Sequence, residues 1–213
     1  MSKGRYICFE GGDLTGKTTM AHEVKGWLLS QGIVSKVAPQ PGSTQLGEHL
    51  RHIVKHEKRI LIGNETEALI FVLDHMAFVE NILREALDEG IWILSDRNNY
   101  VSALVYQTLN GVDPDRLDEF YSIIPTPKLD VIFLLDAPLD ALASRAEQRN
   151  DGKWDRYESN PGFMKKVYDS YVKLDKDHLA RLSKIADSVC RIDAEGDQST
   201  VFGRIKDHLT GLL

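Results

Sequence analysis

A glycine-rich loop near the start of the chain fits the pattern G-x-x-x-x-G-K-[ST], with the sequence Gly11-Gly12-Asp13-Leu14-Thr15-Gly16-Lys17-Thr18. Its glycines allow the backbone to turn so that successive N–H groups converge on phosphate oxygens. We expect Lys17 to reach the β- and γ-phosphates of a nucleoside triphosphate and the Thr18 hydroxyl to bind Mg²⁺. A chance match is disfavoured because the loop lies between a predicted strand and a predicted helix. The expected nucleotide-binding residues here are Gly11, Gly12, Asp13, Thr15, Gly16, Lys17, Thr18 and Thr19.

A second polar pair, Asp96 and Arg97, directly follows the apolar run 91–95. An acid at the end of a buried strand near the phosphate loop suits the Mg²⁺ shell, directly or through water. Arg97 has the planar fork that can clamp a phosphate with two hydrogen bonds. The alternative is an ion pair at the surface. Given the phosphate loop, we interpret Thr18 and Asp96 as metal ligands and Arg97 as a phosphate ligand.

Cations recur through the polar stretch 145–158, at Arg145, Arg149, Lys153 and Arg156. Such a segment suits a mobile lid that closes over the phosphates, excludes water and adds positive charge. The alternative is a solvated charged loop. With the lid included, the expected catalytic residues are Lys17, Asp96, Arg97, Arg149, Lys153 and Arg156.

Short apolar runs alternate with helical patterns along the chain. Strands are predicted at 6–9, 34–37, 91–95, 131–135 and 188–192, and helices at 18–30, after Thr44, and at 66–87, 137–148, 160–184 and 198–212. Polar and apolar residues do not strictly alternate in these strands, which is typical of strands that are covered on both faces. The pattern predicts one α/β domain, residues 1–213. Its expected architecture is a three-layer P-loop NTPase fold: a five-stranded parallel sheet with helices on both faces, a mobile lid, and ligands at the carboxyl ends of the strands.

Composition narrows the classes of function. The chain has 213 residues, 42% apolar and 27% charged, which is ordinary for a soluble globular protein, and its net charge of −6 disfavours a nucleic-acid substrate. Its apolar runs are too short for a membrane span or a signal peptide. Cys8 and Cys190 lie far apart in predicted buried strands, which disfavours a zinc site and fits free thiols in a reducing cytosol. We therefore expect a cytoplasmic protein with small-molecule partners, no nucleic acid and no membrane.

Three histidines, His49, His52 and His56, share one face of a predicted helix and invite comparison with metal ligands. Arg51 and Lys55 accompany them, and no second ligand cluster is evident. We interpret this face as solvated.

Several motifs along the chain resemble those of the thymidylate kinases. They are Phe9-Glu10-Gly11-Gly12-Asp13-x-x-Gly16-Lys17-Thr18-Thr19, Pro41-Gly42-Ser43-Thr44-x-Leu46-Gly47-Glu48 with Leu50-Arg51, Phe71-x-x-Asp74-His75, Asp96-Arg97 followed by Ser102-x-x-x-Tyr106-Gln107, Arg156-Tyr157-Glu158 and Ile192-Asp193-Ala194. Many families share the phosphate loop, whereas the later set is specific in combination. The resemblance spans nearly the whole chain. It implies a homodimeric nucleoside monophosphate kinase that uses ATP and Mg²⁺ and phosphorylates dTMP or a related deoxypyrimidine monophosphate.

The resemblance also implies roles for residues around the acceptor. Asp13 would contact the sugar 3′-hydroxyl, Phe71 would stack on the pyrimidine and Arg97 would hold the acceptor phosphate. Tyr106 would crowd the 2′ position and so favour deoxyribose. The expected substrate-binding residues are Asp13, Phe71, His75, Arg97, Ser102, Ala103, Tyr106 and Tyr157.

On the donor side, the resemblance places Arg145 near the adenine of ATP. Leu14 stands where one subgroup carries a catalytic arginine. The resemblance therefore implies the other subgroup, in which lid cations do that work.

Four departures from the family pattern concern the base. His75 replaces an arginine that hydrogen-bonds the thymine carbonyl, Ala103 replaces a polar residue, and Gln40 replaces a glutamate. The segment between Arg97 and Ser102 is one residue longer than usual. We expect His75 to donate a hydrogen bond with shorter reach, and the base to be thymine, uracil or a 5-modified pyrimidine.

Two rival functions stay open at this stage. The first is a kinase acting on a modified pyrimidine in DNA or on a free nucleoside, and the acidic net charge disfavours the DNA substrate. The second is a non-catalytic NTP-binding switch, which Phe71 and Arg97 disfavour because a switch needs no acceptor site.

Overall fold

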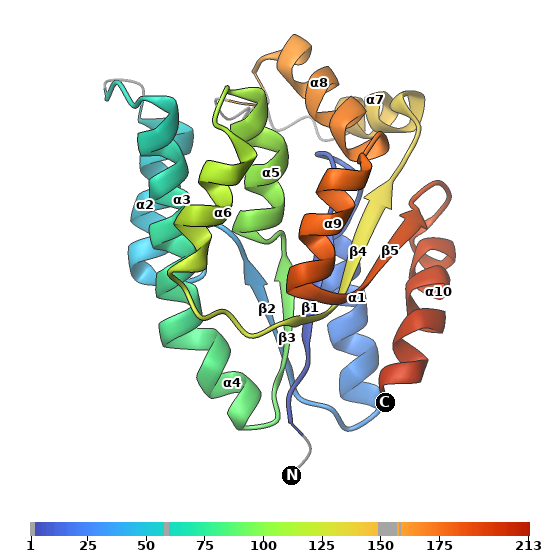
Figure 1. Cartoon of the computed structure of the whole chain (residues 1–213). Helices are drawn as coiled ribbons and strands as arrows, with labels where there is room; N and C mark the ends of the chain where they lie inside the picture. The colour runs from blue at the N-terminus through green and yellow to red at the C-terminus, as the bar shows by residue number, and fades with distance from the viewer. Residues whose placement is uncertain (1–2, 58–59, 149–156, 158) are drawn as a thin grey trace.

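The described residues form a five-stranded parallel sheet with the order β2-β3-β1-β4-β5 (Figure 1). The strands are β1 (Tyr6–Glu10), β2 (Ser35–Pro39), β3 (Trp92–Asp96), β4 (Leu129–Asp136) and β5 (Ala186–Asp193). The computed structural model describes residues 3–57, 60–148, 157 and 159–213. Each of the five predicted strands is confirmed, with ends that differ by one to two residues. The three-layer α/β architecture is confirmed as well.

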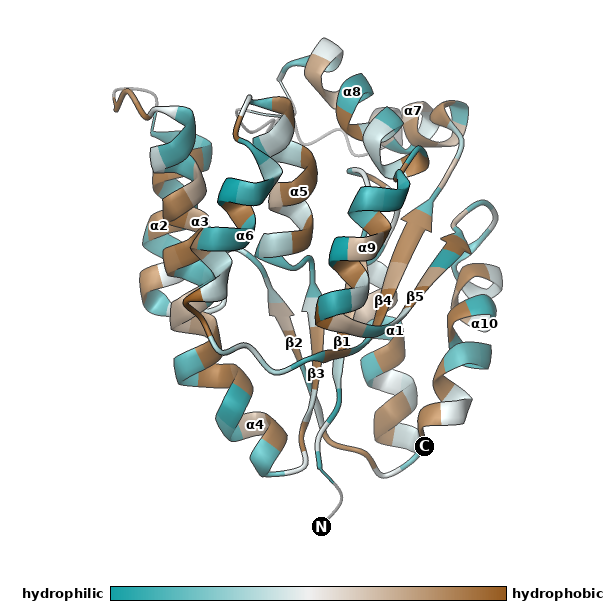
Figure 2. Cartoon of the chain, in the orientation of Figure 1, coloured by the Kyte–Doolittle hydropathy of each residue, from teal (hydrophilic) through white to brown (hydrophobic). Residues whose placement is uncertain are grey.

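Each central strand is buried on both faces, which explains the absence of polar alternation in the sequence. Tyr6 and Cys8 of β1 point into one apolar cluster, whereas Ile7 and Phe9 point into the other. Figure 2 shows the strands as a hydrophobic centre between helices with mixed faces. The sheet therefore separates two cores, and its carboxyl edge remains free for polar residues.

Helices cover both faces of this sheet. One face carries α3 (Asn64–Phe78), α4 (Arg84–Asp88), α5 (Asn99–Leu109), α6 (Pro114–Ser122) and α9 (Lys176–Ile185), with a π-helical turn (Val79–Leu83) between α3 and α4. The other face carries α1 (Lys17–Ser30) and α10 (Gln198–Leu209), and a short 3₁₀ turn (Thr210–Leu212) follows α10. The remaining helices are α2 (Gln45–His56), which contacts α3, α7 (Leu139–Gln148), and α8 (Pro161–Val172), which contacts α5.

Two predictions about helices were wrong or incomplete. The single helix predicted over 160–184 is two helices, because the Asp175 carboxylate accepts a hydrogen bond from the His178 N–H and starts α9 after a non-helical break. Helices α5 and α6 were not predicted. Their start signals were present, since Asn98 caps α5 and Asp113 caps α6 ahead of Pro114.

The expectation for Cys190 also needs correction. Cys8 is buried as expected, but Cys190 is only half-buried, because β5 is an edge strand. Both are free thiols. Within the described ranges, no helix combines the length and the apolar character needed to cross a membrane.

Candidate active site

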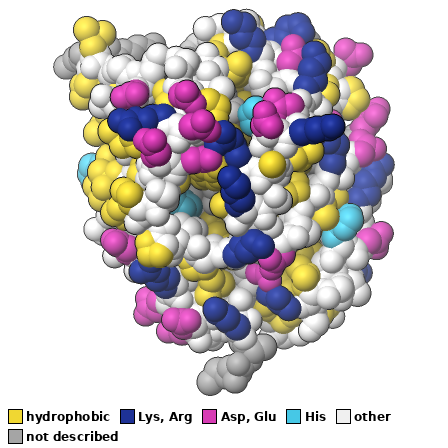
Figure 3. Space-filling view, viewed as in Figure 1, with side chains coloured by type: hydrophobic (Ala, Val, Ile, Leu, Met, Phe, Trp, Pro, Cys, Tyr) yellow, Lys and Arg dark blue, Asp and Glu magenta, His cyan; other side chains and the backbone are white. Residues whose placement is uncertain are grey.

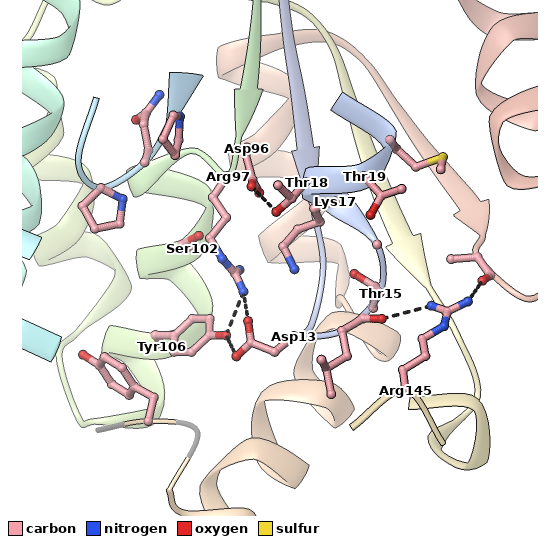
Figure 4. A pocket seen from close by; sticks show the side chains of 18 of the residues that line it. Asp13, Thr15, Lys17, Thr18, Thr19, Asp96, Arg97, Ser102, Tyr106 and Arg145 are labelled. Carbon is pink, nitrogen blue, oxygen red and sulfur yellow. Dashed lines mark hydrogen bonds and ion pairs between the residues drawn. The ribbon is translucent and has the colours of Figure 1, made fainter. Parts of the chain in front are cut away.

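A cavity of about 870 Å³ opens at the carboxyl edge of the sheet, around the phosphate loop (Figure 4). On one side it extends along α3 and α5, where Phe71 and Tyr106 form part of its wall; we call this the α5 arm. On the other side it extends to Arg145 and the start of α10; we call this the α10 arm. The phosphate loop lies between the two arms, so two ligands can meet above it.

The phosphate loop takes its shape from backbone conformations that favour glycine. Gly11 has a φ of 136°, and a Cβ there would lie 2.3 Å from the Leu135 carbonyl oxygen. Gly16 has a φ of 95° and immediately precedes the first residue of α1. Among the described residues, no side chain caps the start of this helix, and its first N–H groups have no intrahelical partner, which is the arrangement that an anion site requires.

Lys17 lies at the centre of the cavity, and its ammonium points between Arg97 and Thr15 in Figure 4. Nζ donates a hydrogen bond of 2.6 Å to the Gly12 carbonyl oxygen. Burial, together with the charge of Arg97, lowers the pKa of Lys17 to about 8. The side chain is thus a largely desolvated cation at neutral pH, held by a backbone oxygen that a phosphate can replace.

Thr18 and Asp96 face each other across the start of α1 and the end of β3. The Thr18 hydroxyl donates to Asp96 Oδ2 at 2.5 Å. The two oxygens are hard ligands of the kind that Mg²⁺ prefers. In the described part of the chain, no group of three or more His, Cys, Asp or Glu side chains could hold a metal by itself. One or two protein oxygens completed by water and phosphate is the usual Mg²⁺ arrangement in phosphoryl-transfer sites, and this pair fits it.

Arg97 has a left-handed backbone conformation, with a φ of 74°, which turns its side chain back over the phosphate loop. Its guanidinium forms an ion pair with Asp13 and donates to the Gly11 carbonyl at 3.1 Å and to the Tyr106 hydroxyl at 3.3 Å. The left-handed region costs an ordinary residue about 1 kcal/mol or more, and the surrounding bonds hold it there. Arg97 is therefore held between the loop and α5.

Asp13 is ionised in this arrangement. Burial raises the pKa of its carboxyl, but the charges of Arg97, Lys17 and Lys55 outweigh that effect and bring the pKa to about 2. The Tyr106 hydroxyl lies 3.5 Å from Asp13 Oδ2. Asp13 thus presents a hydrogen-bond acceptor toward the cavity at neutral pH.

Glu10, the last residue of β1, is a positioning residue that the sequence analysis missed. Its fully buried carboxylate accepts hydrogen bonds of 2.8 Å from the Asn98 N–H, the Ser102 hydroxyl and the Tyr171 hydroxyl. It also lies 3.5 Å from the Arg97 guanidinium. Glu10 therefore ties α5 and α8 to the base of Arg97. The position of Glu10 directly before the phosphate-loop motif could have indicated its role. No sequence pattern indicates the role of Tyr171.

The wall of the α5 arm is one face of a helix. Residues 99, 102, 103, 106 and 107 line the cavity at helical spacing. Ser102, Ala103 and Tyr106 are thus brought together as predicted, although the Ser102 hydroxyl is committed to Glu10. Tyr157 lines the same arm and packs edge-on against Tyr106, with ring centroids 5.5 Å apart.

His75 is the predicted substrate ligand that the structure places elsewhere. It is 2% exposed and lies outside the cavity wall. Nδ1 lies 2.9 Å from Gln40 Oε1 and Nε2 lies 3.1 Å from the Thr126 hydroxyl. Burial lowers the pKa of His75 to about 4, so the ring is neutral and both nitrogens have partners. A hydrogen bond from His75 to the base stays a prediction, and it would require one of these two contacts to break.

The α10 arm contains Arg145, whose guanidinium donates to the Leu14 carbonyl at 3.0 Å and to the Ala194 carbonyl at 2.8 Å (Figure 4). Thr19 also lines the cavity. The predicted lid cations Arg149, Lys153 and Arg156 lie outside the described residues. The structure therefore describes the two ends of the predicted lid, at Arg145 and Tyr157.

Comparison with known proteins gives consistent matches over this region. The family model described as thymidylate kinase matches residues 9–200. A thymidylate kinase of Bradyrhizobium diazoefficiens is 31% identical over 206 residues, covering 95% of this chain and 87% of that protein. A probable thymidylate kinase of Pyrococcus horikoshii is 31% identical over 213 residues, covering 99% of this chain and 100% of that protein. A thymidylate kinase of Prochlorococcus marinus is 32% identical over 192 residues, covering 86% and 90%.

Proposed function

The chain belongs to the thymidylate kinase family, and on that premise we propose that it transfers the γ-phosphoryl group of ATP to dTMP or a related deoxypyrimidine monophosphate. The observation that carries the proposal is the two-armed cavity with the phosphate loop at its centre. A triphosphate in the α10 arm and a monophosphate in the α5 arm would meet head to head beside Lys17 and Arg97. This is the geometry that direct transfer needs.

Phosphoryl transfer requires the protein mainly to position the two substrates and to supply positive charge. The attacking oxygen belongs to a phosphate whose second pKa is about 6, so it is already largely ionised at neutral pH and needs no general base. Lys17 would hold the β- and γ-phosphates of the donor. Arg97 would hold the acceptor phosphate in line with the moving group. Both cations also stabilise negative charge in the transition state.

Magnesium fits the pair of oxygens from Thr18 and Asp96, which are 2.5 Å apart and both suited to a hard cation. We propose that these two residues hold it, directly or through water. Held there, Mg²⁺ would supply positive charge to the donor phosphates. Thr18 and Asp96 would fix its place beside Lys17.

The acceptor sugar would lie between Asp13 and Tyr106. The ionised Asp13 carboxylate suits a hydrogen bond from the 3′-hydroxyl, and the partly buried Tyr106 ring, whose hydroxyl lies 3.5 Å from Asp13, would leave little room for a 2′-hydroxyl. Phe71 supports a stacked pyrimidine, because it forms part of the wall of the α5 arm. A uracil or 5-modified base remains within the proposal. The adenine of ATP would lie beside Arg145.

The lid remains a proposal for residues outside the described ranges. We propose that Arg149, Lys153 and Arg156 bring positive charge to the moving phosphoryl group. Position 14 is a leucine and not an arginine, which supports the assignment of this charge to the lid cations. It would make closure of segment 145–158 a condition for fast transfer.

We propose small nucleotides, rather than nucleic acid, as the partners. The net charge of −6 supports this, and Figure 3 shows cationic and anionic side chains intermixed over the face in view. The free thiols Cys8 and Cys190 support a cytoplasmic location.

We further propose a homodimer. Leu46 of α2 and Leu69 and Leu73 of α3 are 44–47% exposed, and hydrophobic side chains gather over these helices at the left of Figure 3. Burial of this surface against a second copy would remove it from water. Sedimentation at micromolar concentration tests the proposal, and a monomer would contradict it.

The deciding experiment for the function is a panel of nucleoside monophosphates incubated with ATP and Mg²⁺, with the products identified by mass. We expect dTMP to become dTDP. Phosphorylation of free nucleosides alone, or hydrolysis of ATP without transfer to any monophosphate, would favour the rival functions. A salt-dependent shift of DNA on a gel would favour a DNA substrate.

A further inference from the structure

The α5 arm contains a polar residue to which the family resemblance assigns no role. Asn99 is the first residue of α5, is 2% exposed and forms part of the cavity wall. It lies in the segment between Arg97 and Ser102 that is one residue longer than usual. Asn99 and Ala103 are four positions apart on one helix and face the same arm. A polar side chain therefore stands one turn before the position where the family's polar residue is missing.

The Asn99 amide can take only one orientation. Its nitrogen Nδ2 donates to the Phe71 carbonyl oxygen at 2.9 Å and to Asp74 Oδ2 at 2.6 Å. A backbone carbonyl can only accept, so the nitrogen and not the oxygen must face Phe71. Asp74 is in turn held by the Gly42 N–H at 3.0 Å. Reversal of the amide would place two acceptors against Asn99 Oδ1.

The oxygen of the same amide, Asn99 Oδ1, has no hydrogen-bond partner among the described residues. It is also absent from the fully enclosed polar atoms that lack a partner, which belong to Ser35, Gln107, Thr108 and Tyr121. Asn99 lines the cavity and is 2% exposed, so the small accessible surface that this oxygen retains is assigned to the cavity. Asn99 thus presents an acceptor whose direction is fixed by the two donor bonds behind it.

Neighbouring polar groups are committed to the protein itself. Both nitrogens of His75 have partners. Gln40 donates to Tyr6 and Ser95 through Nε2, and its Oε1 accepts from His75 and from the Asn99 N–H. The substitutions at positions 40 and 75 therefore satisfy each other, and they leave the base to be read by another group.

We propose that Asn99 is the residue that reads the base, with Oδ1 accepting a hydrogen bond from the ring N3–H. The inference rests on the proposed function and narrows its substrate class to pyrimidines with an imide N–H, namely thymine, uracil and 5-substituted uracils. Cytosine is disfavoured, because its N3 carries a lone pair and would set two acceptors against each other. An acceptor left facing another acceptor in a buried site is costly, which is how polar sites discriminate between ligands of equal shape.

The test measures kcat/KM for dTMP, dUMP and dCMP with the wild type, Asn99→Ala and a matched control, Asn110→Ala. Asn110 lies at the other end of α5, outside the cavity wall. We expect the wild type and the control to prefer dTMP and dUMP over dCMP by about 100-fold. Asn99→Ala should lose ~10- to 100-fold on dTMP and dUMP and little on dCMP, so that the preference falls below ~10-fold.

The outcomes separate the inference from the function on which it rests. Equal loss on all three substrates, or an unchanged preference, would assign Asn99 a structural role and overturn the inference. The wild type alone decides the matter if the variant does not fold, because use of dCMP as readily as dTMP contradicts a fixed acceptor at N3. If the wild type binds ATP but phosphorylates no monophosphate, the proposed function fails and the inference fails with it.

Discussion

Arg97 at the end of β3 forms an ion pair with Asp13 of the phosphate loop, so two residues 84 positions apart lock the loop to the sheet edge. The Tyr106 hydroxyl lies within 3.5 Å of both side chains. The cation proposed for the acceptor phosphate and the anion proposed for the acceptor sugar thus orient each other before any ligand binds. Because these side chains are already oriented, less side-chain entropy is lost when the substrate binds.

Replacement of Arg97 by lysine should preserve the charge but lose the fork that reaches several acceptors at once. We expect kcat/KM for the monophosphate to fall ~10²-fold, with the KM for ATP nearly unchanged. Steady-state kinetics with each substrate varied in turn measures this. Arg116→Lys is the control, because Arg116 is half-exposed and pairs with Glu119 at the surface. Near-normal acceptor kinetics in Arg97→Lys would contradict the assigned role.

Lys17→Ala should abolish turnover and leave the fold intact. The loss follows from removal of a desolvated cation at the centre of the cavity, and a rate reduction of at least ~10²–10³ is expected by analogy with other transition-state contacts. Single-turnover transfer measures the chemistry, and circular dichroism with a thermal melt verifies the fold. A folded variant with most of its activity would invalidate the mechanism.

Asp96→Asn should make the enzyme more dependent on magnesium. The amide keeps the shape but loses the negative charge facing Thr18, so the Mg²⁺ concentration for half-maximal activity should rise about 10-fold or more. A magnesium titration at saturating ATP measures the shift. Asp187→Asn, at an exposed pair with Lys128, should behave like the wild type. If both variants titrate alike, Asp96 does not contribute to the metal shell.

His75 should make stability depend on pH. Burial lowers the pKa of His75 from 6.5 to about 4 in the folded chain. Between these two pH values the ring is protonated in the unfolded chain but neutral in the folded chain. Stability is therefore lost as the pH falls from 6.5 toward 4. Between pH 7 and pH 5 the loss from this one group is about 2 kcal/mol.

The measurement is urea unfolding at several pH values for the wild type and for His75→Gln. The variant removes the titrating ring, so the difference between the two curves isolates it from the neighbouring Asp74 and Tyr121. Burial raises the pKa of the Asp74 carboxyl, which acts in the opposite direction at low pH and is common to both proteins. Parallel curves would show that the ring is protonated in the folded chain.

The phosphate loop and the five strands were predictable because their signals are local. Residues 11–18 carry their function in their spacing, and an apolar run bounded by turns predicts a buried strand wherever it occurs. The position of Asp96 and Arg97 followed from the same logic, since the carboxyl ends of parallel strands meet at one edge. Helices α5 and α6 have equally local start signals, because Asn98 and Asp113 cap their first turns.

Tertiary structure alone decided which polar side chain faces the cavity and which faces the protein. His75 was expected to be a ligand, but its Nδ1 finds a partner in Gln40, 35 positions away. Glu10 and Tyr171 meet across 161 positions, and no pattern in either neighbourhood predicts it. The physical reason is that a motif specifies the type of a side chain, whereas its direction depends on the donors and acceptors that distant segments bring within about 3 Å.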